Sequence, residues 1–177
     1  MRILIFLSVL TLIACSKEPK GPDLSNVEFT ETYHYNGQLK SIGKYVNDKL
    51  EGEFKRYYES GQLRQIVNFV NGKEEGEWKA YHKNGQLWEI GNFVNGKQEG
   101  KFKQYYESGQ LYTIGYLVNQ KLEGETKWYH KNGQLWSTGN FVNDKKEGEW
   151  KFYDENGQLW EIEDWSNGEK LGFRKIN

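Results

Sequence analysis

The chain has 177 residues, and its 24 Lys and Arg residues nearly balance its 25 Asp and Glu residues. This balance argues against a nucleic-acid-binding protein, which would need a basic face. Aromatic residues make up 16% of the chain and glycines number 20, whereas prolines number only 2, a composition typical of strands and tight turns rather than of a thick core.

Residues 1–14 have the layout of an export signal. Arg2 is followed by a mostly apolar stretch that ends at Ala14, which is shorter than the about 20 residues that a membrane-spanning helix needs. The sequence LIAC at 12–15 resembles the bacterial lipobox and implies lipidation of Cys15. Cys15 is the only cysteine, so it cannot form a disulfide within the chain. An ordinary signal peptide followed by an unmodified cysteine remains the alternative.

These features predict a protein of the cell envelope that is held at a membrane by the lipid on Cys15, at the outer membrane if the organism is Gram-negative. Residues 15–28 are polar and contain Pro19 and Pro22, so we expect a flexible tether after the lipid. The remaining residues, 29–177, form the predicted repeat domain.

That domain repeats with a period of 24 residues, the mark of a repeat architecture. Three series share this step: the glycine of a Gly-Gln-Leu motif, a second glycine and a turn asparagine. They fall at Gly37, Gly61, Gly85, Gly109, Gly133 and Gly157; at Gly52, Gly76, Gly100, Gly124, Gly148 and Gly172; and at Asn47, Asn71, Asn95, Asn119, Asn143 and Asn167. The two glycine series never vary, which predicts a positive φ or a close backbone approach there, whereas the residue after the asparagine is Gly, Asp or Gln.

Short runs rich in Tyr, Phe, Trp, Ile and Val separate these turns and have strand composition. Each unit is predicted to be two strands and two turns, with Lys83, Asn84 and Gly85 in a type I turn closed by a glycine bulge. The fold prediction is therefore all-β: an elongated single-layer antiparallel sheet of about six hairpin repeats, roughly 55 to 60 Å long at about 4.8 Å per strand.

Counting outward from this loop gives a predicted register. It pairs Tyr81 with Leu87, Ala80 with Trp88, and Trp78 with Ile90. Through the other units the last pair becomes Phe54 with Ile66, Phe102 with Ile114, Thr126 with Thr138, and Trp150 with Ile162. The unit that lacks the aromatic residue also lacks the Ile, a joint change that a cross-strand pair predicts.

The same register predicts the two faces of the sheet. One face carries Trp78, Trp88, Ile90, Val94 and their equivalents, and Trp128 lies opposite Trp136. The other face carries Tyr81, Leu87 and Phe93 together with Lys79 and Glu89.

Aromatic residues supply the candidate binding surface. One position of the repeat holds Lys40 and Arg64 in the first two units and an aromatic residue in the next four. A second set of aromatic residues is expected beside it on the same face of the sheet. The candidate residues are Trp78, Trp88, Tyr112, Trp128, Trp136, Trp150 and Trp160. Two interpretations stay open: the rings stack across strands and hold a coreless sheet together, or they form an exposed surface that binds a protein or a glycan.

Three histidines recur in alternate units, at His34, His82 and His130, and alternate with Tyr58 and Tyr106. Four strands separate successive histidines, about 19 Å, so they cannot ligate one metal ion. A glutamate recurs before the second glycine of each unit, at Glu75, Glu99, Glu123 and Glu147, and a residue copied in this way is expected to be structural. The sequence predicts no catalytic, metal or cofactor site.

The unit from Gly76 to Gly100, GEWKAYHKNGQLWEIGNFVNGKQEG, resembles the MORN-repeat variant of bacterial proteins, many of which are labelled YwqK-type antitoxins. The resemblance covers roughly residues 30–174. It implies a hairpin-repeat protein without catalytic residues. We therefore expect a non-enzymatic, lipid-anchored envelope protein that binds a protein partner in an immunity (antitoxin-like) or scaffolding role. The alternative is a glycan-binding module for envelope polysaccharide.

Overall fold

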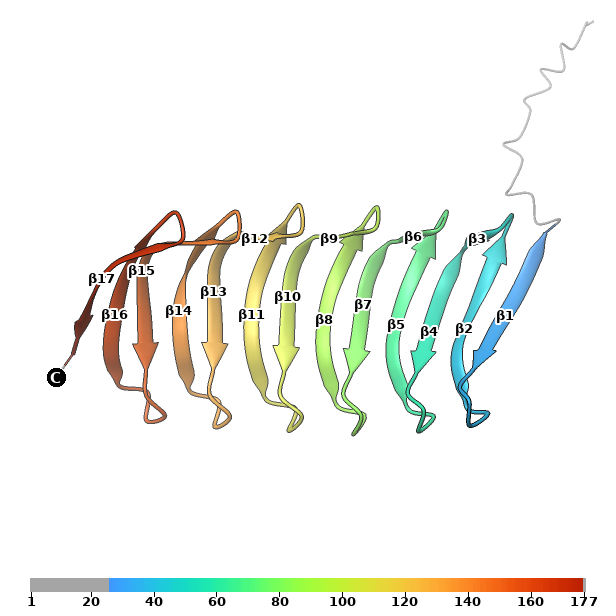
Figure 1. Cartoon of the computed structure of the whole chain (residues 1–177), viewed down its shortest axis with the longest axis horizontal. Helices are drawn as coiled ribbons and strands as arrows, with labels where there is room; N and C mark the ends of the chain where they lie inside the picture. The colour runs from blue at the N-terminus through green and yellow to red at the C-terminus, as the bar shows by residue number, and fades with distance from the viewer. Residues whose placement is uncertain (1–25, 177) are drawn as a thin grey trace, which may run out of the picture.

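The computed structural model describes residues 26–176, which form one antiparallel sheet of 17 strands without a helix (Figure 1). The predicted signal, Cys15 and most of the predicted tether lie outside the described residues. The longer strands are β1 (Val27–Tyr33), β2 (Leu39–Val46), β4 (Gly52–Tyr57), β5 (Leu63–Val70), β7 (Gly76–Tyr81), β8 (Leu87–Val94), β10 (Gly100–Tyr105), β11 (Leu111–Val118), β13 (Gly124–Tyr129), β14 (Leu135–Val142), β15 (Lys145–Tyr153), β16 (Leu159–Ser166) and β17 (Glu169–Lys175). Two-residue strands follow the asparagine turns, which we name the upper turns after their place in Figure 1, the Gly-Gln-Leu turns being the lower turns. They are β3 (Lys49–Leu50), β6 (Lys73–Glu74), β9 (Lys97–Gln98) and β12 (Lys121–Leu122).

The long strands stand side by side in chain order along the longest axis of the molecule, with the Gly-Gln-Leu turns at one end of the strands and the asparagine turns at the other (Figure 1). Each long strand pairs with the strands before and after it, as β8 does with β7 and β10. This arrangement confirms the predicted single antiparallel sheet of hairpin repeats.

The Gly-Gln-Leu turns have the predicted geometry. Gly85 N donates to His82 O at 2.9 Å, and His82 N donates to Gln86 O at 2.8 Å. Gly85 has φ +86°, the left-handed conformation that closes a type I turn with a glycine bulge.

The asparagine turns also need positive φ angles, although the sequence predicted these only at the invariant glycines. Asn95 and Gly96 have φ of 53° and 78°, and both central residues of a type I′ turn need such values. The second place keeps a positive φ even where it is not glycine: 63° at Asp48, 68° at Gln120 and 66° at Asp144. A variable residue therefore occupies a constrained position, whereas the invariant Gly172 has neither a positive φ nor a close neighbour, so the prediction is wrong there.

The predicted register is right only for the two pairs nearest the loop, the first of which joins His82 and Gln86. Tyr81 lies opposite Leu87, but Ala80 then lies opposite Glu89, Lys79 opposite Ile90, and Trp78 opposite Gly91. Trp88 is the extra residue of a β-bulge, and one extra residue shifts every later pair by one position. The predicted pairs of Phe54, Trp78, Phe102, Thr126 and Trp150 with the Ile or Thr residues are therefore wrong.

Two corrections follow for the unit in which Thr126 replaces the ring. Thr126 lies opposite Gly139, while Thr138 lies opposite Lys127. Trp128 lies opposite Ser137, so it does not face Trp136.

The bulge also changes the faces. Trp78, Ala80, Gly91 and Phe93 share one side, which we name the inner face together with their equivalents in the other units. Lys79, Tyr81, Ile90 and Asn92 alternate with them and form the outer face with theirs. The predicted grouping of Trp78 with Ile90, and of Phe93 with Tyr81, is therefore wrong.

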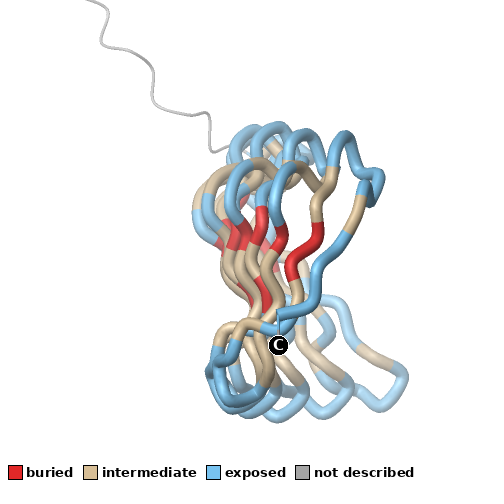
Figure 2. The backbone as a smooth tube through the Cα atoms, turned by 90° about the vertical axis from the view of Figure 1, so that its left-hand side faces the viewer, coloured by how far each residue is buried: buried red, intermediate tan, exposed pale blue. Residues whose placement is uncertain are grey.

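The packed core lies on the inner face. One cluster consists of the buried residues Val67, Phe69, Trp78 and Ala80, with Leu50, Phe54 and Phe93 packed against it. Seen end-on, the buried residues lie midway along the strands, and both rows of turns are exposed (Figure 2). The core is thus a line of side chains that runs from unit to unit.

Candidate binding surfaces

The structure divides the predicted aromatic surface into two groups. Trp78 and Trp150 are buried on the inner face, and Trp128 packs against Trp150 with ring centroids 5.4 Å apart. The other four residues, Trp88, Tyr112, Trp136 and Trp160, occupy the bulge position of successive units, and we name them the bulge column. The prediction that all seven rings share one surface is therefore wrong.

Glycines in the middle of strands make room for the buried rings, and the sequence-based predictions did not include them. A Cβ atom on Gly91 would lie 2.8 Å from Nε1 of Trp78, and one on Gly43 would lie 2.5 Å from the Phe54 ring. A Cβ on Gly139 would overlap the Trp150 ring. The signal was present in the sequence as a third glycine series, at Gly43, Gly91, Gly115 and Gly139, which has the same step except that Val67 interrupts it.

Trp150 is the most enclosed ring of the inner face, with 2% of its surface exposed. Its ring contacts Phe141 at 5.1 Å between centroids, in an edge-to-face arrangement. Lys146 Nζ lies 4.1 Å from the centroid of the Trp150 ring and 4.4 Å from that of Trp165, which is cation–π geometry.

At this C-terminal end, one charged residue replaces the small or apolar residue of the other units. Glu163 stands where the earlier units have Gly or Val, and it accepts hydrogen bonds from Trp165 Nε1 at 2.9 Å and from Lys170. Burial by itself raises the pKa of Glu163, but the bonds from Lys170 and Trp165 outweigh it and hold that pKa below its ordinary value. Burial lowers the pKa of Lys146. Lys146, Glu163 and Lys170 thus place charged groups beside two rings of the inner face, Trp150 and Trp165.

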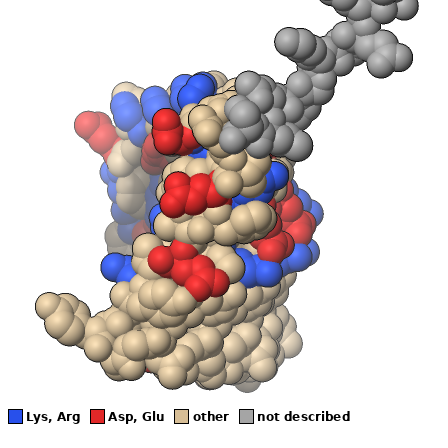
Figure 3. All heavy atoms as spheres, turned by 90° about the vertical axis from the view of Figure 1, so that its right-hand side faces the viewer, with Lys and Arg blue, Asp and Glu red and all other residues tan. Residues whose placement is uncertain are grey.

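The two edges of the sheet differ in charge. Edge strand β17 contains Lys170, Arg174 and Lys175, and such residues discourage pairing with another strand. Edge strand β1 contains two glutamates and no basic residue, and its Phe29 is 72% exposed. The view onto this end shows acidic side chains across it and an uncharged surface below (Figure 3). Of the two edges, β1 is the less protected.

The bulge column contains the exposed tryptophans of residues 26–176. Trp88, Trp136 and Trp160 keep 44%, 39% and 41% of their surfaces accessible. Trp88 and Trp136 each lie against the histidine of their unit, with ring centroids 6.4 Å apart in both cases. Equivalent side chains recur every second strand, about 9.6 Å apart. The column is therefore a row of half-exposed rings at a regular spacing along the sheet.

The histidines have a structural role that explains their alternation with tyrosine. His82 Nε2 lies 2.9 Å from Tyr105 O, and since a carbonyl oxygen only accepts, this nitrogen donates. In the alternate units Tyr58 and Tyr106 donate through their hydroxyls to the equivalent carbonyls, at 2.7 and 2.8 Å. His and Tyr thus perform the same task, which ties each lower turn to the next hairpin.

The repeated glutamates also have a structural role, as predicted. Glu75 Oε2 accepts from Asn95 N at 2.8 Å, and the same bond recurs in the other units: Glu51 to Asn71, Glu99 to Asn119, Glu123 to Asn143, and Glu147 to Asn167. Each carboxylate therefore satisfies the first amide of an upper turn.

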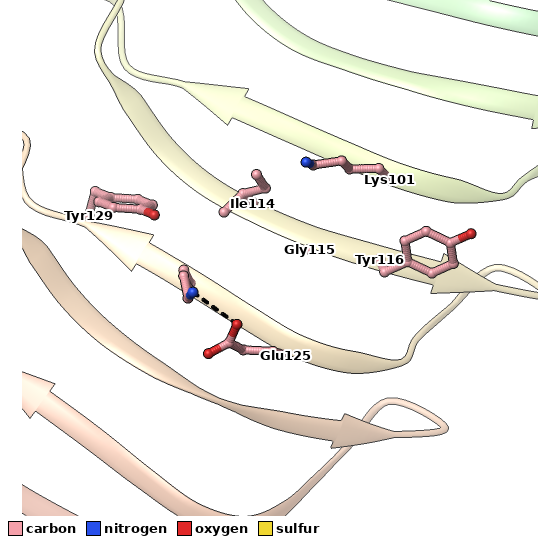
Figure 4. Close-up of a pocket in the computed structure, with 7 residues that line it drawn as sticks. Lys101, Ile114, Gly115, Tyr116, Glu125 and Tyr129 are labelled. Atoms are coloured by element: carbon pink, nitrogen blue, oxygen red, sulfur yellow. Dashed lines mark ion pairs between the residues drawn. The ribbon is translucent and has the colours of Figure 1, made fainter.

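The outer face carries ion pairs along single strands. Lys79 Nζ lies 2.8 Å from Glu77, and the hydrogen bond to Glu77 raises the pKa of Lys79. Equivalent pairs join Lys55 to Glu53, Lys127 to Glu125, and Lys151 to Glu149. Between β10 and β13 the face has a shallow hollow of about 400 Å³ (Figure 4). Its lining includes Lys101, Ile114, Tyr116, Glu125 and Tyr129.

Within residues 26–176, no group of three His, Cys, Asp or Glu side chains could hold a metal ion. That same part of the chain contains no helix long and apolar enough to cross a membrane. Glu89 is a half-buried carboxyl on the inner face; burial raises its pKa, and a hydrogen bond from Gln104 opposes this shift.

The repeat geometry agrees with a family comparison. The model described as "MORN repeat variant" matches residues 30–47, 50–71, 74–95, 98–119, 122–143 and 146–167. The chain belongs to the MORN repeat variant family. Membership suggests a repeat module for protein interaction or membrane binding. No curated protein matches the chain.

Two solved structures show a limited likeness to this MORN repeat chain. The first, a "GtfA/B complex bound to UDP and GlcNAc", is 14% identical, with a TM-score of 0.27 over 63% of this chain and 22% of that one. The second, "TcdB2-TccC3-TEV", is 14% identical, with a TM-score of 0.28 over 81% of this chain and 10% of that one. The chain spans less than a quarter of either structure.

Proposed function

We propose that the chain is a non-enzymatic, lipid-anchored protein of the cell envelope that binds a protein partner through the bulge column. The observation that carries this proposal is the exposure of Trp88, Trp136 and Trp160 in a molecule whose other tryptophans pack on the inner face. Half-exposed Trp and Tyr rings are common energetic centres of protein interfaces. Six units of a MORN repeat family support a role in interaction rather than in catalysis.

The bulge geometry supports a binding role for the column. The extra residue of a β-bulge is free of the regular ladder, and bulges commonly re-aim a side chain. In the first two units Lys40 and Arg64 occupy the position, so the repeat can be built without a ring there. The rings of the later units are therefore an addition to a fold that tolerates other residues.

Envelope location is proposed on the lipobox-like sequence that ends at Cys15. A partner would then be another envelope protein, which restricts an immunity (antitoxin-like) role to toxins that act there and also allows a scaffolding role. The Cys15→Ser variant should lose metabolic labelling by palmitate and leave the membrane fraction. A labelled variant that still sediments with membranes in high salt would contradict the anchor.

A glycan of the envelope is the second candidate, and the regular spacing of the column favours it. Rings about 9.6 Å apart suit a linear polysaccharide whose sugars stack on successive platforms, because Trp and Tyr offer an apolar face with a polar edge.

The test compares the triple variant Trp88→Thr, Trp136→Thr, Trp160→Thr with a matched control. The control replaces Val70, Val94 and Val142 by Thr, which are exposed apolar residues of 42%, 41% and 44% accessibility in the same sheet. Both proteins are assayed for capture of envelope proteins and for binding to purified peptidoglycan or lipopolysaccharide. Loss of protein capture in the tryptophan variant alone supports the proposal. Loss of glycan binding alone assigns the column to polysaccharide, and unchanged binding of both kinds contradicts a binding role.

A further inference from the structure

Among the five hairpins between β4 and β16, one breaks the pattern of the outer face. In four hairpins an acidic residue lies opposite an amide or acidic residue: Glu53 opposite Asn68, Glu77 opposite Asn92, Glu125 opposite Asn140, and Glu149 opposite Asp164. In the hairpin of β10 and β11, Lys101 lies opposite Tyr116. Both members of the cross-strand pair have changed together.

The exchange alters the charge of this unit. In the other four hairpins the lysine two residues further on is paired with the glutamate, as Lys79 is with Glu77. Lys103 instead follows a second lysine, and among residues 26–176 neither Lys101 nor Lys103 makes an ion pair. The unit therefore presents two positive charges on the outer face where its neighbours present one of each sign.

The two lysines stand at two shallow hollows whose linings mix apolar and charged side chains. Lys101 lines the hollow of about 400 Å³ beside Ile114 and Tyr116, and also the neighbouring hollow of about 260 Å³ beside Ile90. Lys103 lies between Ile90 and Ile114 in the sheet register. Tyr116 is 49% exposed, and Figure 4 shows Lys101 and Tyr116 on neighbouring strands among the residues that line the first hollow.

From this arrangement we propose that Lys101, Lys103 and Tyr116 form a docking point for an acidic, extended peptide segment of the partner protein. Side chains two residues apart on a strand lie on one face, about 7 Å apart. An extended peptide presents its own alternate side chains with the same spacing, so two carboxylates at positions i and i+2 match the two ammonium groups. The ring and the isoleucines then receive the apolar parts of the segment.

Charge complementarity favours this occupant over the other ones. The spacing of the lysines is that of a polypeptide strand, whereas the carboxylates of an acidic polysaccharide are spaced by its sugar rings. A flat anionic membrane would engage lysines along the whole outer face, but Lys55, Lys79, Lys127 and Lys151 are each paired with a glutamate. The inference rests on the proposed partner-binding function and names the chemistry of the partner.

The repeat supplies variants that are safe for the fold. Lys101→Glu and Tyr116→Asn install the residues that other units carry at the same positions, and Glu77→Lys copies the double lysine into the preceding unit. The full chain in a neutral detergent is titrated into a fluorescein-labelled peptide of six alternating glutamate and threonine residues, at low salt. A peptide of alternating glutamine and threonine is the control, and fluorescence anisotropy is the readout.

We expect the acidic peptide to bind, and the Lys101→Glu variant to bind about tenfold more weakly, since it loses one attraction and gains one repulsion. Glu77→Lys should increase the number of bound peptides per chain. Equal binding by the Lys101→Glu variant, or by the glutamine peptide, would overturn the proposal. So would binding of oligogalacturonate or of phosphatidylglycerol vesicles without binding of the acidic peptide, and these outcomes would assign the lysines to an acidic glycan or to a membrane.

Failure of this inference is distinguishable from failure of the proposed function. A partner that is captured equally by wild type and by Lys101→Glu, but is lost by the triple tryptophan variant, contradicts the docking point and leaves the bulge column in place. A partner lost by Lys101→Glu and kept by the tryptophan variant supports the docking point and contradicts the column.

Discussion

The inner and outer faces repeat with the same period but vary in opposite ways. On the inner face, the position of the buried ring varies and holds Phe54, Trp78, Phe102, Thr126 and Trp150. On the outer face, the residue after each of these is always Lys, and the residue three places after each of them is always Tyr. The inner residues vary because each is fitted to its neighbours, as Gly139 is to Trp150. The outer residues pack loosely, so a departure from their pattern, as at Lys101, reflects the solvent-facing surface rather than the core.

The largest expected effect separates the two tryptophan groups. Trp150→Ala should destabilise the sheet by about 4 kcal/mol, as expected when a buried ring is truncated. Trp160→Ala, at a half-exposed position of the same hairpin, should cost about 1 kcal/mol, because part of its area already faces water. Urea denaturation followed by tryptophan fluorescence measures both. Comparable losses at the two sites would mean that the inner face does not hold the fold.

The second prediction tests the fit of the mid-strand glycines. Gly139→Val should cost about 3 kcal/mol, because the new atoms overlap the Trp150 ring and overpacking strains a core. Gly172→Ala is the control: no atom lies within 4 Å of the added Cβ, and its φ is not in the left-handed region. It should leave the melting temperature almost unchanged. A tolerant Gly139 together with a sensitive Gly172 would contradict a register that places Gly139 against the Trp150 ring.

The third prediction concerns the charged end of the inner face. Because the folded-state pKa of Glu163 lies below its ordinary value of 4.5, its stabilising contribution is present above that value and is lost as the pH falls through the folded-state pKa. Glu163→Gln should cost about 2 kcal/mol at neutral pH through the loss of charge-assisted hydrogen bonds.

The same variant should also lose less stability than wild type when the pH is lowered below 4.5. Unfolding free energies measured between neutral and acidic pH give both numbers. Parallel pH profiles for the two proteins would show that Glu163 has the same pKa in the folded and unfolded chains. Glu169→Gln, an exposed change on the neighbouring edge strand, is the control and should follow wild type.

The fourth prediction concerns the stability cost of removing rings from the bulge column. Trp88→Thr and Trp136→Thr should cost similar amounts, about 1 kcal/mol each, because both rings have the same centroid distance to a histidine, 6.4 Å. The register predicted from sequence would instead make Trp136 more costly, since it placed that ring opposite Trp128. Thermal melts of the two variants decide between the registers, and a clearly larger loss at Trp136 would favour the one predicted from sequence.

Much of the fold follows from the sequence because the period, the strand composition and the turn residues all repeat. The register did not follow, because counting pairs outward from a loop assumes a regular ladder, and the bulge at Trp88 adds a residue without changing composition. The joint change of Thr126 and Thr138 was misleading for the same reason: these residues lie on opposite faces. The informative signal was the mid-strand glycine, since Gly91 and Gly139 lie against the rings of Trp78 and Trp150.

The candidate site was predictable in composition and not in geometry. The sequence identified the seven aromatic residues, and only the backbone path could divide them into buried rings and an exposed column. Lys101 carries no signal in the sequence by itself, because its significance lies in the residues around it. It becomes visible once Tyr116 is known to lie opposite it and once the lysines equivalent to Lys103 are seen to be paired with a glutamate.

The smallest effect is expected at a position that serves the hairpin junctions rather than either face. His82→Tyr should change the unfolding free energy by less than about 0.5 kcal/mol, because a tyrosine hydroxyl makes the same bond in the alternate units, where Tyr106 donates to Tyr129 O at 2.8 Å. A tyrosine at this position also packs against a ring of the bulge column, since the ring centroids of Tyr106 and Tyr112 lie 5.0 Å apart. His82→Ala, which leaves the carbonyl of Tyr105 without its donor, should cost about 1 kcal/mol. Equal losses for the two variants in urea denaturation would mean that the imidazole is needed for its contact with Trp88, and would tie the histidines to the column rather than to the junction.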